Sequence, residues 1–281
     1  IGLLLMATAM LIIPSSDAIA KYLSGAHSPA FLSWARYIAA LGFILPVGVI
    51  LNYALAYPQG WITPGLARAA WHTITLGATA SVLTVLLALV MVYGVRLSGR
   101  ALPRLLMPVT TIGYAAPGAV LGVGILIPLA AADHALADTV ERAFGVDIGL
   151  LMTGSAFALV LAYCVRFFAI AQGAADAAMG RVSPNLALAA RSLGRNQGQT
   201  LGAVYYPLIR ASIASALLLV FVDCVKELPA TLLLRPFNYD TLATRVHSQA
   251  SLENIAGATP AVLLIILVGL CAVGLLARAN R

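Results

Sequence analysis

Three charged side chains stand close together in an otherwise apolar part of the chain. Asp223, Lys226 and Glu227 are spaced i, i+3 and i+4, so a helix would carry all three on one face. Pro229 follows and would break that helix. Counted from Pro207 at the helical rise, Asp223 lies about 24 Å along the segment. Charges inside an apolar helix are costly, which indicates either a functional polar surface or an ion pair that locks two helices together.

The sequence gives no support for nucleotide binding, metal binding or catalysis. No Gly-rich phosphate-binding loop of the Walker type occurs. The four histidines are scattered, and no group of His, Cys and carboxylate residues has metal-ligand spacing. No serine has a nearby His and Asp that could activate it. The sequence therefore predicts a protein with no catalytic residue, no metal site and no cofactor.

The second candidate site is a polar interruption, residues 183–207, between two long apolar segments. Ser183 and Pro184 are suited to begin a helix, and Gly194 is suited to end it. One short apolar face at helical spacing is formed by Leu186, Ala189, Ala190 and Leu193. A second short helix is expected from about Gln197 to Tyr206, ended by Pro207. Arg191, Arg195 and Arg210 make this region basic.

Two interpretations of this stretch remain open from physical chemistry alone. A long, basic, helix-forming stretch between two apolar segments is typical of a surface to which another protein docks. The alternative is a linker helix that rests on lipid headgroups.

Composition places both candidate sites in a membrane protein. Of the 281 residues, 61% are hydrophobic and 10% are charged, whereas a soluble domain carries about 25% charged residues. The apolar residues form blocks of about 20, the length that crosses a hydrocarbon core of roughly 30 Å. The sequence predicts an all-α, polytopic membrane protein with six or seven spans, at about residues 2–23, 32–56, 69–95, 106–131, 149–172, 208–230 and 257–277.

The distribution of Lys and Arg predicts the orientation of these spans. The linkers 96–104 and 173–207 and the C-terminal tail are basic, whereas the linkers 132–148 and 231–256 hold most of the acids. Because Lys and Arg collect on the cytoplasmic side, the first set is expected inside and the second outside. The net charge of +7 then reflects cytoplasmic loops, and no nucleic-acid partner is expected.

The spacing within the polar stretch resembles the "EAA" loop of ABC importer permeases. That family's pattern is Glu-Ala-Ala, three residues, Gly, nine residues, Ile, any residue, Leu, Pro. The resemblance implies a loop whose short coupling helices sit in a groove of an ATPase subunit, with coupling residues Leu188, Ala189, Ala190, Gly194, Val204 and Pro207. Leu188 stands where the family has Glu. The loss of that charge is expected to weaken docking.

Two further stretches, 111–129 and 221–246, resemble the ferric-iron importer permeases in their C-terminal half. The resemblance implies a type I ABC importer permease core over residues 38–281, in the bacterial inner membrane. It also implies ferric iron as cargo, a periplasmic substrate-binding protein and a separate dimer of ABC ATPase subunits. Because one half is present, a second permease half or a homodimer is expected. An outer gate would then be formed by Asp223, Lys226, Glu227 and Pro229.

Residues 2–37 differ from that family and resemble the start of a drug/metabolite transporter, with Asp17, Lys21, Pro29 and Trp34 among the cues. We therefore expect an extra N-terminal membrane segment over residues 1–37, joined by gene fusion near Tyr37. Two other functions stay open: an ATP-independent secondary carrier of the drug/metabolite type, and an inactive remnant half-permease. In the importer interpretation the chain is no enzyme, and a separate chain hydrolyses ATP.

Overall fold

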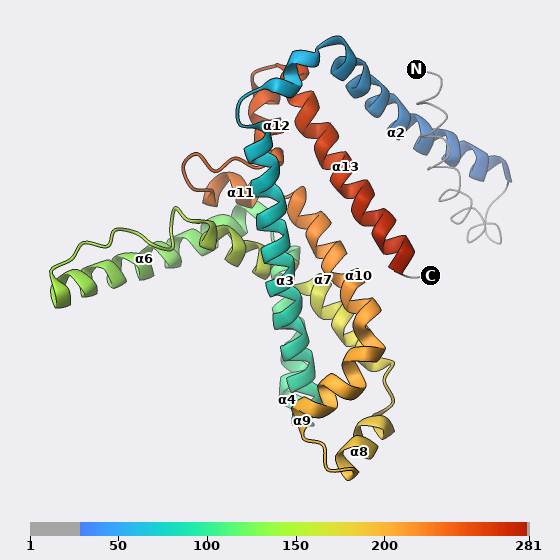
Figure 1. Ribbon diagram of the computed structural model, residues 1–281, viewed down its shortest axis with the longest axis vertical. Coiled ribbons are helices and arrows are strands. Elements are labelled where there is room, and N and C mark those ends of the chain that lie inside the picture. Colours follow the sequence, from blue (N-terminus) through green and yellow to red (C-terminus); the bar gives the residue numbers. More distant parts are fainter. Residues whose placement is uncertain (1–28, 280–281) are drawn as a thin grey trace.

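The computed structural model describes residues 29–279, and this part of the chain is helical without any strand. Five helical segments within it are long and apolar enough to cross a membrane (Figure 1). They are α3 (Leu66–Ser98), α6 (Gly118–Phe144), α7 (Ala156–Gly180), the continuous run from α9 into α10 (Gln197–Val225) and α13 (Ile255–Ala279). The prediction of an all-α, polytopic membrane protein is confirmed.

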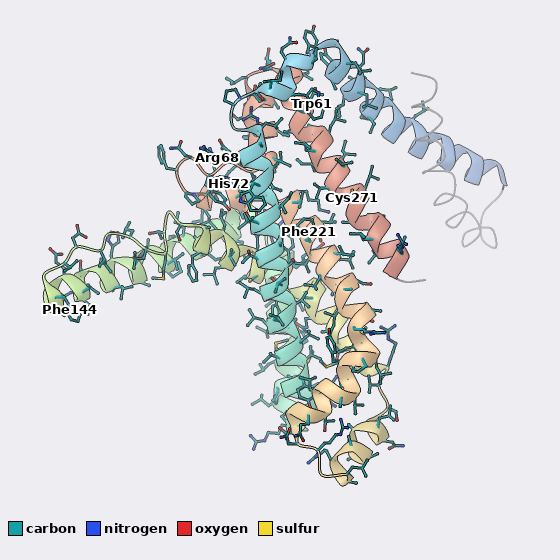
Figure 2. The ribbon with its side chains drawn as sticks, viewed as in Figure 1. Trp61, Arg68, His72, Phe144, Phe221 and Cys271 are labelled. Atoms are coloured by element: carbon teal, nitrogen blue, oxygen red, sulfur yellow. The ribbon has the colours of Figure 1, made fainter. Side chains whose placement is uncertain are left out.

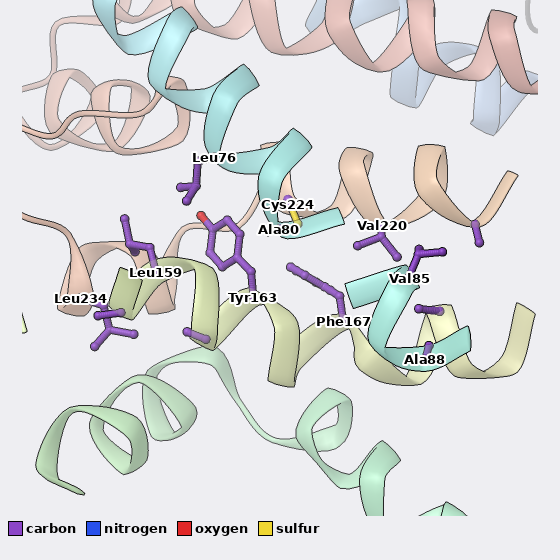
Figure 3. Packing of buried hydrophobic residues seen from close by; sticks show 14 of the residues in the cluster. Leu76, Ala80, Val85, Ala88, Leu159, Tyr163, Phe167, Val220, Cys224 and Leu234 are labelled. Atoms are coloured by element: carbon purple, nitrogen blue, oxygen red, sulfur yellow. The ribbon is translucent and has the colours of Figure 1, made fainter. Parts of the chain in front are cut away.

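Helices α3, α7 and α10 pack side by side and form the centre of the protein (Figure 1). Tyr163 and Phe167 of α7 lie between the other two helices (Figure 3), and both are buried. Gly77 of α3 leaves room for the Phe221 ring of α10, because a Cβ added at Gly77 would meet that ring at 3.1 Å. In a bilayer, close packing of this kind is a main source of helix association.

Four predicted spans, 69–95, 149–172, 208–230 and 257–277, coincide with α3, α7, α10 (Tyr206–Val225) and α13, apart from their ends. The predicted span 106–131 is wrong. Three short helical pieces, α4 (Ala101–Leu106), η2 (Met107–Thr111) and α5 (Ile112–Ala115), come first, and α6 begins only at Gly118. Ala116 is extended, with ψ 137°, because the ring of the following Pro117 disfavours helical geometry in the residue before it.

The predicted outer loop at 132–148 is also wrong, because α6 continues through it to Phe144. The second half of α6 is rich in strong helix formers, and the helix ends only where Gly145 adopts φ +67°. α6 points away from the central helices, with Phe144 at its far tip (Figures 1 and 2). Its buried residues are Gly118, Gly122, Leu129 and Asp133.

Asp133 fastens α6 to the chain that leads into α7. Its carboxylate accepts N–H groups from Leu151, Met152 and Thr153 at 2.9, 2.9 and 2.7 Å, and the Thr153 hydroxyl at 2.7 Å. The side chain is buried, and these donors satisfy it. An acid that the charge pattern assigned to an outer loop therefore holds a helical hairpin together.

Several further helical elements meet at the N-terminal end of α3. This end carries η1 (Pro58–Ile62), α12 (Leu242–Ser251) and the start of α13 (Figure 1). A buried cluster joins them, formed by Leu66, Ala69, Leu242 and Ala261. The His72 ring stacks on Tyr239 with centroids 4.0 Å apart. The 231–256 linker thus lies at the opposite end of α3 from residues 183–207, as the charge asymmetry predicts.

The N-terminal predictions are tested only in part. α2 (Pro29–Ala56) precedes the core as one helix of 28 residues and covers the predicted span 32–56. The predicted span 2–23 lies outside the described residues. The division near Tyr37 stays a prediction.

Gly113 marks a close approach of α5 to α7, because an added Cβ would overlap the carbonyl oxygen of Val165. Backbone cannot turn aside as a flexible side chain can, so Gly113→Ala should lower the free energy of unfolding by about 1–3 kcal/mol. Gly94→Ala on α3 is the matched control, since nothing lies within 4 Å of its added Cβ. Thermal unfolding of the purified protein in detergent measures both variants. Equal stability of the two would contradict this close approach.

Candidate functional site

The polar stretch begins with a short helix whose C-terminal end is tightly defined. α8 spans Pro184–Ser192. Gly194 has φ +82°, its N–H bonds the Arg191 carbonyl at 3.0 Å, and the Arg195 N–H bonds the Ala190 carbonyl at 3.1 Å. This pair of bonds is the Schellman arrangement, which favours glycine at the left-handed position. The prediction that Gly194 ends the helix is confirmed.

The predicted start of this helix needs a correction. Ser183 occupies the N-cap position, but its side chain makes no capping hydrogen bond. Pro184 at the first helical position instead fixes the entry, because its ring presets a helical φ and no N–H is lost there.

The second half of the stretch also differs from the prediction. α9 (Gln197–Thr200) begins with a capping box between Asn196 and Gln199. The chain then runs through one π-helical turn, η3 (Leu201–Tyr205), directly into α10. Pro207 therefore lies in the first turn of a long helix and does not end a short one. A proline there cannot donate a helical hydrogen bond, and the wider π turn comes directly before it.

The leucine side chains of α8 face outward. Leu186, Leu188 and Leu193 are 49%, 56% and 83% exposed, whereas Ala190 is buried. The predicted apolar face is therefore split, because Ala190 is buried and the three leucines are largely exposed. Within residues 29–279, α8 leaves these leucines uncovered.

Fixed contacts tie the base of this loop to the helix bundle. Val204 packs beside Tyr205 against a buried cluster that contains Val92, Met179 and Ile209. The Tyr93 hydroxyl donates to the Gln197 carbonyl at 2.7 Å, and α3 and α7 are joined by an Arg96–Asp176 ion pair of 2.7 Å. These contacts join the loop to the C-terminal ends of α3 and α7 and to the start of α10.

The charged residues near the end of α10 do not form one cluster. Lys226 and Asp223 form an ion pair with 2.5 Å between Nζ and Oδ1, in which the Lys226 side chain is 64% exposed. α10 ends at Val225, so Glu227 lies beyond the helix and leaves the shared face. Pro229 follows as the first residue of α11 (Pro229–Leu234). The prediction that all three charges share one helix face is wrong.

Glu227 instead forms a buried ion pair with Arg166 from the middle of α7. Arg166 Nε and Glu227 Oε2 are 2.9 Å apart, and the two side chains are 19% and 7% exposed. Arg166 also donates to the Ala116 carbonyl at 2.8 Å, and Glu227 Oε1 accepts the Ala230 N–H at 3.2 Å. The pair therefore joins α7 to both helix breaks, at Ala116–Pro117 and at Lys226–Leu228.

Gly118 gives this ion pair its space. A Cβ added at Gly118 would lie 2.7 Å from Glu227 Oε1 and 3.3 Å from an Arg166 nitrogen. One turn away, the Tyr163 and Thr231 hydroxyls are 2.6 Å apart, and the Thr231 hydroxyl donates to the Glu227 carbonyl at 2.8 Å. Buried polar groups are stable only when partnered in this manner.

Arg166 was not among the residues predicted from the sequence. A signal was available, because a lone arginine inside an apolar segment requires a partner, but spacing along the chain does not reveal one 61 residues away.

The described residues bring no three His, Cys, Asp or Glu side chains together in a way that could hold a metal ion.

Helical hairpins around α3, α7 and α10, with an exposed short helix at one end, have the architecture of ABC transporter permeases. A solved bacterial alginate ABC transporter, in complex with alginate pentasaccharide-bound periplasmic protein, contains a similar chain. The TM-score is 0.62 at 14% identity, over 93% of this chain and 95% of that one. Residues 80–281 match the family of binding-protein-dependent transport system inner membrane components. The chain belongs to this family of inner-membrane proteins.

Two curated relatives are similar over different lengths. The Fe(3+)-transport system permease protein FbpB 2 of Haemophilus influenzae is 33% identical over 111 residues, which are 40% of this chain and 22% of that protein. The 2-aminoethylphosphonate transport system permease protein PhnV of Salmonella typhimurium is 26% identical over 228 residues, which are 76% of this chain and 80% of that protein. The chain thus matches about a fifth of the length of the iron relative.

Proposed function

We propose that this chain is the transmembrane permease subunit of an ATP-driven ABC importer, with a separate ATPase dimer docked at residues 183–207. The exposed leucines of α8, on a loop anchored to α3 and α10, are the observation that carries this proposal. An uncovered apolar helix suits docking into a groove. The coupling residues would be Leu188, Ala189, Ala190, Gly194, Val204 and Pro207. ATP hydrolysis belongs to the partner.

The chain would work together with a second permease half, either another protein or a second copy. α6 supports this, because it projects from the bundle and little of it is buried within this chain (Figure 1). Since a translocation path needs walls on all sides, this long uncovered helix suits contact with another half.

Ferric iron handed over by a periplasmic binding protein is the proposed cargo. The iron-transport relative supports it, together with the resemblance of residues 221–246. The 2-aminoethylphosphonate relative makes a small organic anion the second candidate. In both cases the binding protein would supply most of the cargo selectivity.

The proposed gate involves Asp223, Lys226, Glu227 and Pro229, and we add Arg166. An ATPase can drive a conformational switch only by binding the two states with different affinity. The Arg166–Glu227 pair joins two helix breaks and α7, so its rupture would free all three to rearrange.

Gentle solubilisation of native membranes and purification of this chain tests the proposal. We expect an ATPase and a second permease half to co-purify, and reconstituted vesicles with the binding protein to take up radioactive ferric iron only with ATP. ATP-driven uptake of 2-aminoethylphosphonate instead of iron would correct the cargo alone. A chain that purifies alone would favour the secondary carrier, if it still transports, or the remnant half-permease, if it does not.

A further inference from the structure

A pocket of about 220 Å³ lies between the cytoplasmic end of α3 and the two short helices of the loop. Its wall includes Tyr93 and Arg96 from α3, Leu188 and Arg191 from α8, and Tyr205 from η3. The loop and α3 are held around this pocket by the hydrogen bond between Tyr93 and the Gln197 carbonyl. The pocket thus belongs to the same surface as the exposed leucines.

The two arginines in the wall differ in their partners. Arg96 donates to the Asp176 carboxylate at 2.7 Å and to the Asp176 carbonyl at 3.0 Å. Arg191 is exposed, and no carboxylate or hydrogen-bond acceptor meets its guanidinium within residues 29–279. Asp176 is the only acid in the segment 173–207. One positive charge therefore faces the pocket without a counter-ion.

Leu188 explains why this charge is uncompensated. Leu188 and Arg191 are spaced i and i+3 on α8, and both line the pocket. An acid at position 188 would reach Arg191 from one turn away and neutralise it. With leucine there, the wall beside Arg191 is apolar, and the guanidinium stays available to a group from outside the chain.

We propose that this pocket receives an Asp or Glu side chain of the ATPase subunit, which pairs with Arg191. This proposal rests on the proposed function. A guanidinium binds carboxylate with two parallel hydrogen bonds, and the surrounding Leu188 and tyrosine rings would limit the access of water. Leucine at position 188 is then part of a contact with reversed charge, with the base on the permease and the acid on the ATPase.

The test uses the complex of the full chain with the ATPase that co-purifies with it. Arg191→Lys supplies an amine that a carbodiimide joins to a carboxylate in direct contact. We expect mass spectrometry to find the introduced lysine linked to an Asp or Glu of the ATPase. Arg195→Lys is the matched control, because Arg195 is exposed on the same loop but does not line the pocket, and it should form no such link.

A second variant distinguishes two explanations of Leu188: a contact of reversed charge, and a defect that weakens docking. The two explanations predict opposite changes in ATPase binding. Leu188→Glu should weaken ATPase binding about ten-fold, because the new carboxylate occupies Arg191. If leucine were a defect at this position, the same variant would strengthen binding. Unchanged or tighter binding, or a link to Asp176 alone, would overturn the proposal.

The lipid surface is the competing occupant of the pocket. In bilayers of phosphatidylcholine alone, ATPase binding and the cross-link should persist. Binding that appears only after anionic phosphatidylglycerol is added, without a cross-link to the ATPase, would assign the pocket to a lipid headgroup and overturn the proposal. If the ATPase co-purifies but the link is absent, only this inference falls. If no ATPase co-purifies, the proposed function falls with it.

Discussion

Gly194→Asp should abolish uptake while the chain still inserts into the membrane. Gly194 has φ +82°, a left-handed conformation that costs most residues with a side chain about 1–2 kcal/mol and aspartate less than most. The aspartate would also place a carboxylate beside the exposed face of α8, where the ATPase is proposed to dock. Nothing lies within 4 Å of the added Cβ, so the fold itself should tolerate the change. Uptake in vesicles, with the amount of inserted protein measured in parallel, gives the answer.

Gly99→Asp is the control that separates backbone strain from the loss of docking. Gly99 follows α3 with φ +60°, and an added Cβ there meets nothing within 4 Å. The two substitutions therefore impose similar local costs, but position 99 lies outside residues 183–207. We expect the Gly99 variant to retain uptake. Equal uptake in both variants would count against the coupling role of the loop.

Arg166→Ala should lower the free energy of unfolding by about 3–5 kcal/mol, because it leaves Glu227 buried without its counter-ion. The Ala116 carbonyl would lose its donor as well. Equilibrium unfolding in mixed detergent micelles measures the change. Lys226→Ala is the matched control, since Lys226 is exposed in its ion pair, and its loss should cost about 0–1 kcal/mol.

A double variant separates stability from gating at the same site. Removing both charges, in Arg166→Met with Glu227→Leu, should recover most of the lost stability, because no unpaired charge stays buried. Uptake should remain low if rupture of the ion pair is part of the conformational switch. A stable double variant with full uptake would show that the pair serves the fold alone.

Local sequence signals predicted the central helices well. Long apolar blocks gave α3, α7, α10 and α13, because a segment that crosses a bilayer must satisfy its own backbone hydrogen bonds. Gly194 was placed correctly as a helix end, because a left-handed turn favours glycine in any context. The charge asymmetry also agrees with the placement of residues 183–207 and 231–256 at opposite ends of α3, whereas the linker 132–148 is largely part of α6.

Predictions from single prolines and single acids were wrong where the rest of the fold decides their position. Pro207 was expected to end a short helix, yet it lies in the first turn of α10. Asp133 was assigned to an outer loop on charge alone. In the structure its carboxylate is buried and accepts hydrogen bonds from the N–H groups of residues 151–153. A proline or an acid restricts the conformation of its sequence neighbours only. Groups that are distant in sequence decide whether it lies inside a helix, at a helix end or in a loop.

The sequence by itself determined the class of this protein: its apolar blocks identify a helical membrane protein, and the spacing within residues 183–207 resembles that of ABC importer permeases. Only the tertiary structure decided which charges meet. Glu227 appeared to belong with Asp223 and Lys226, its neighbours in sequence, but its partner is Arg166 on another helix. Helical periodicity describes contacts within one helix, whereas contacts between helices depend on the packing of all of them. The same holds for Leu188 and Arg191, which form a pocket only because α3 closes its other side.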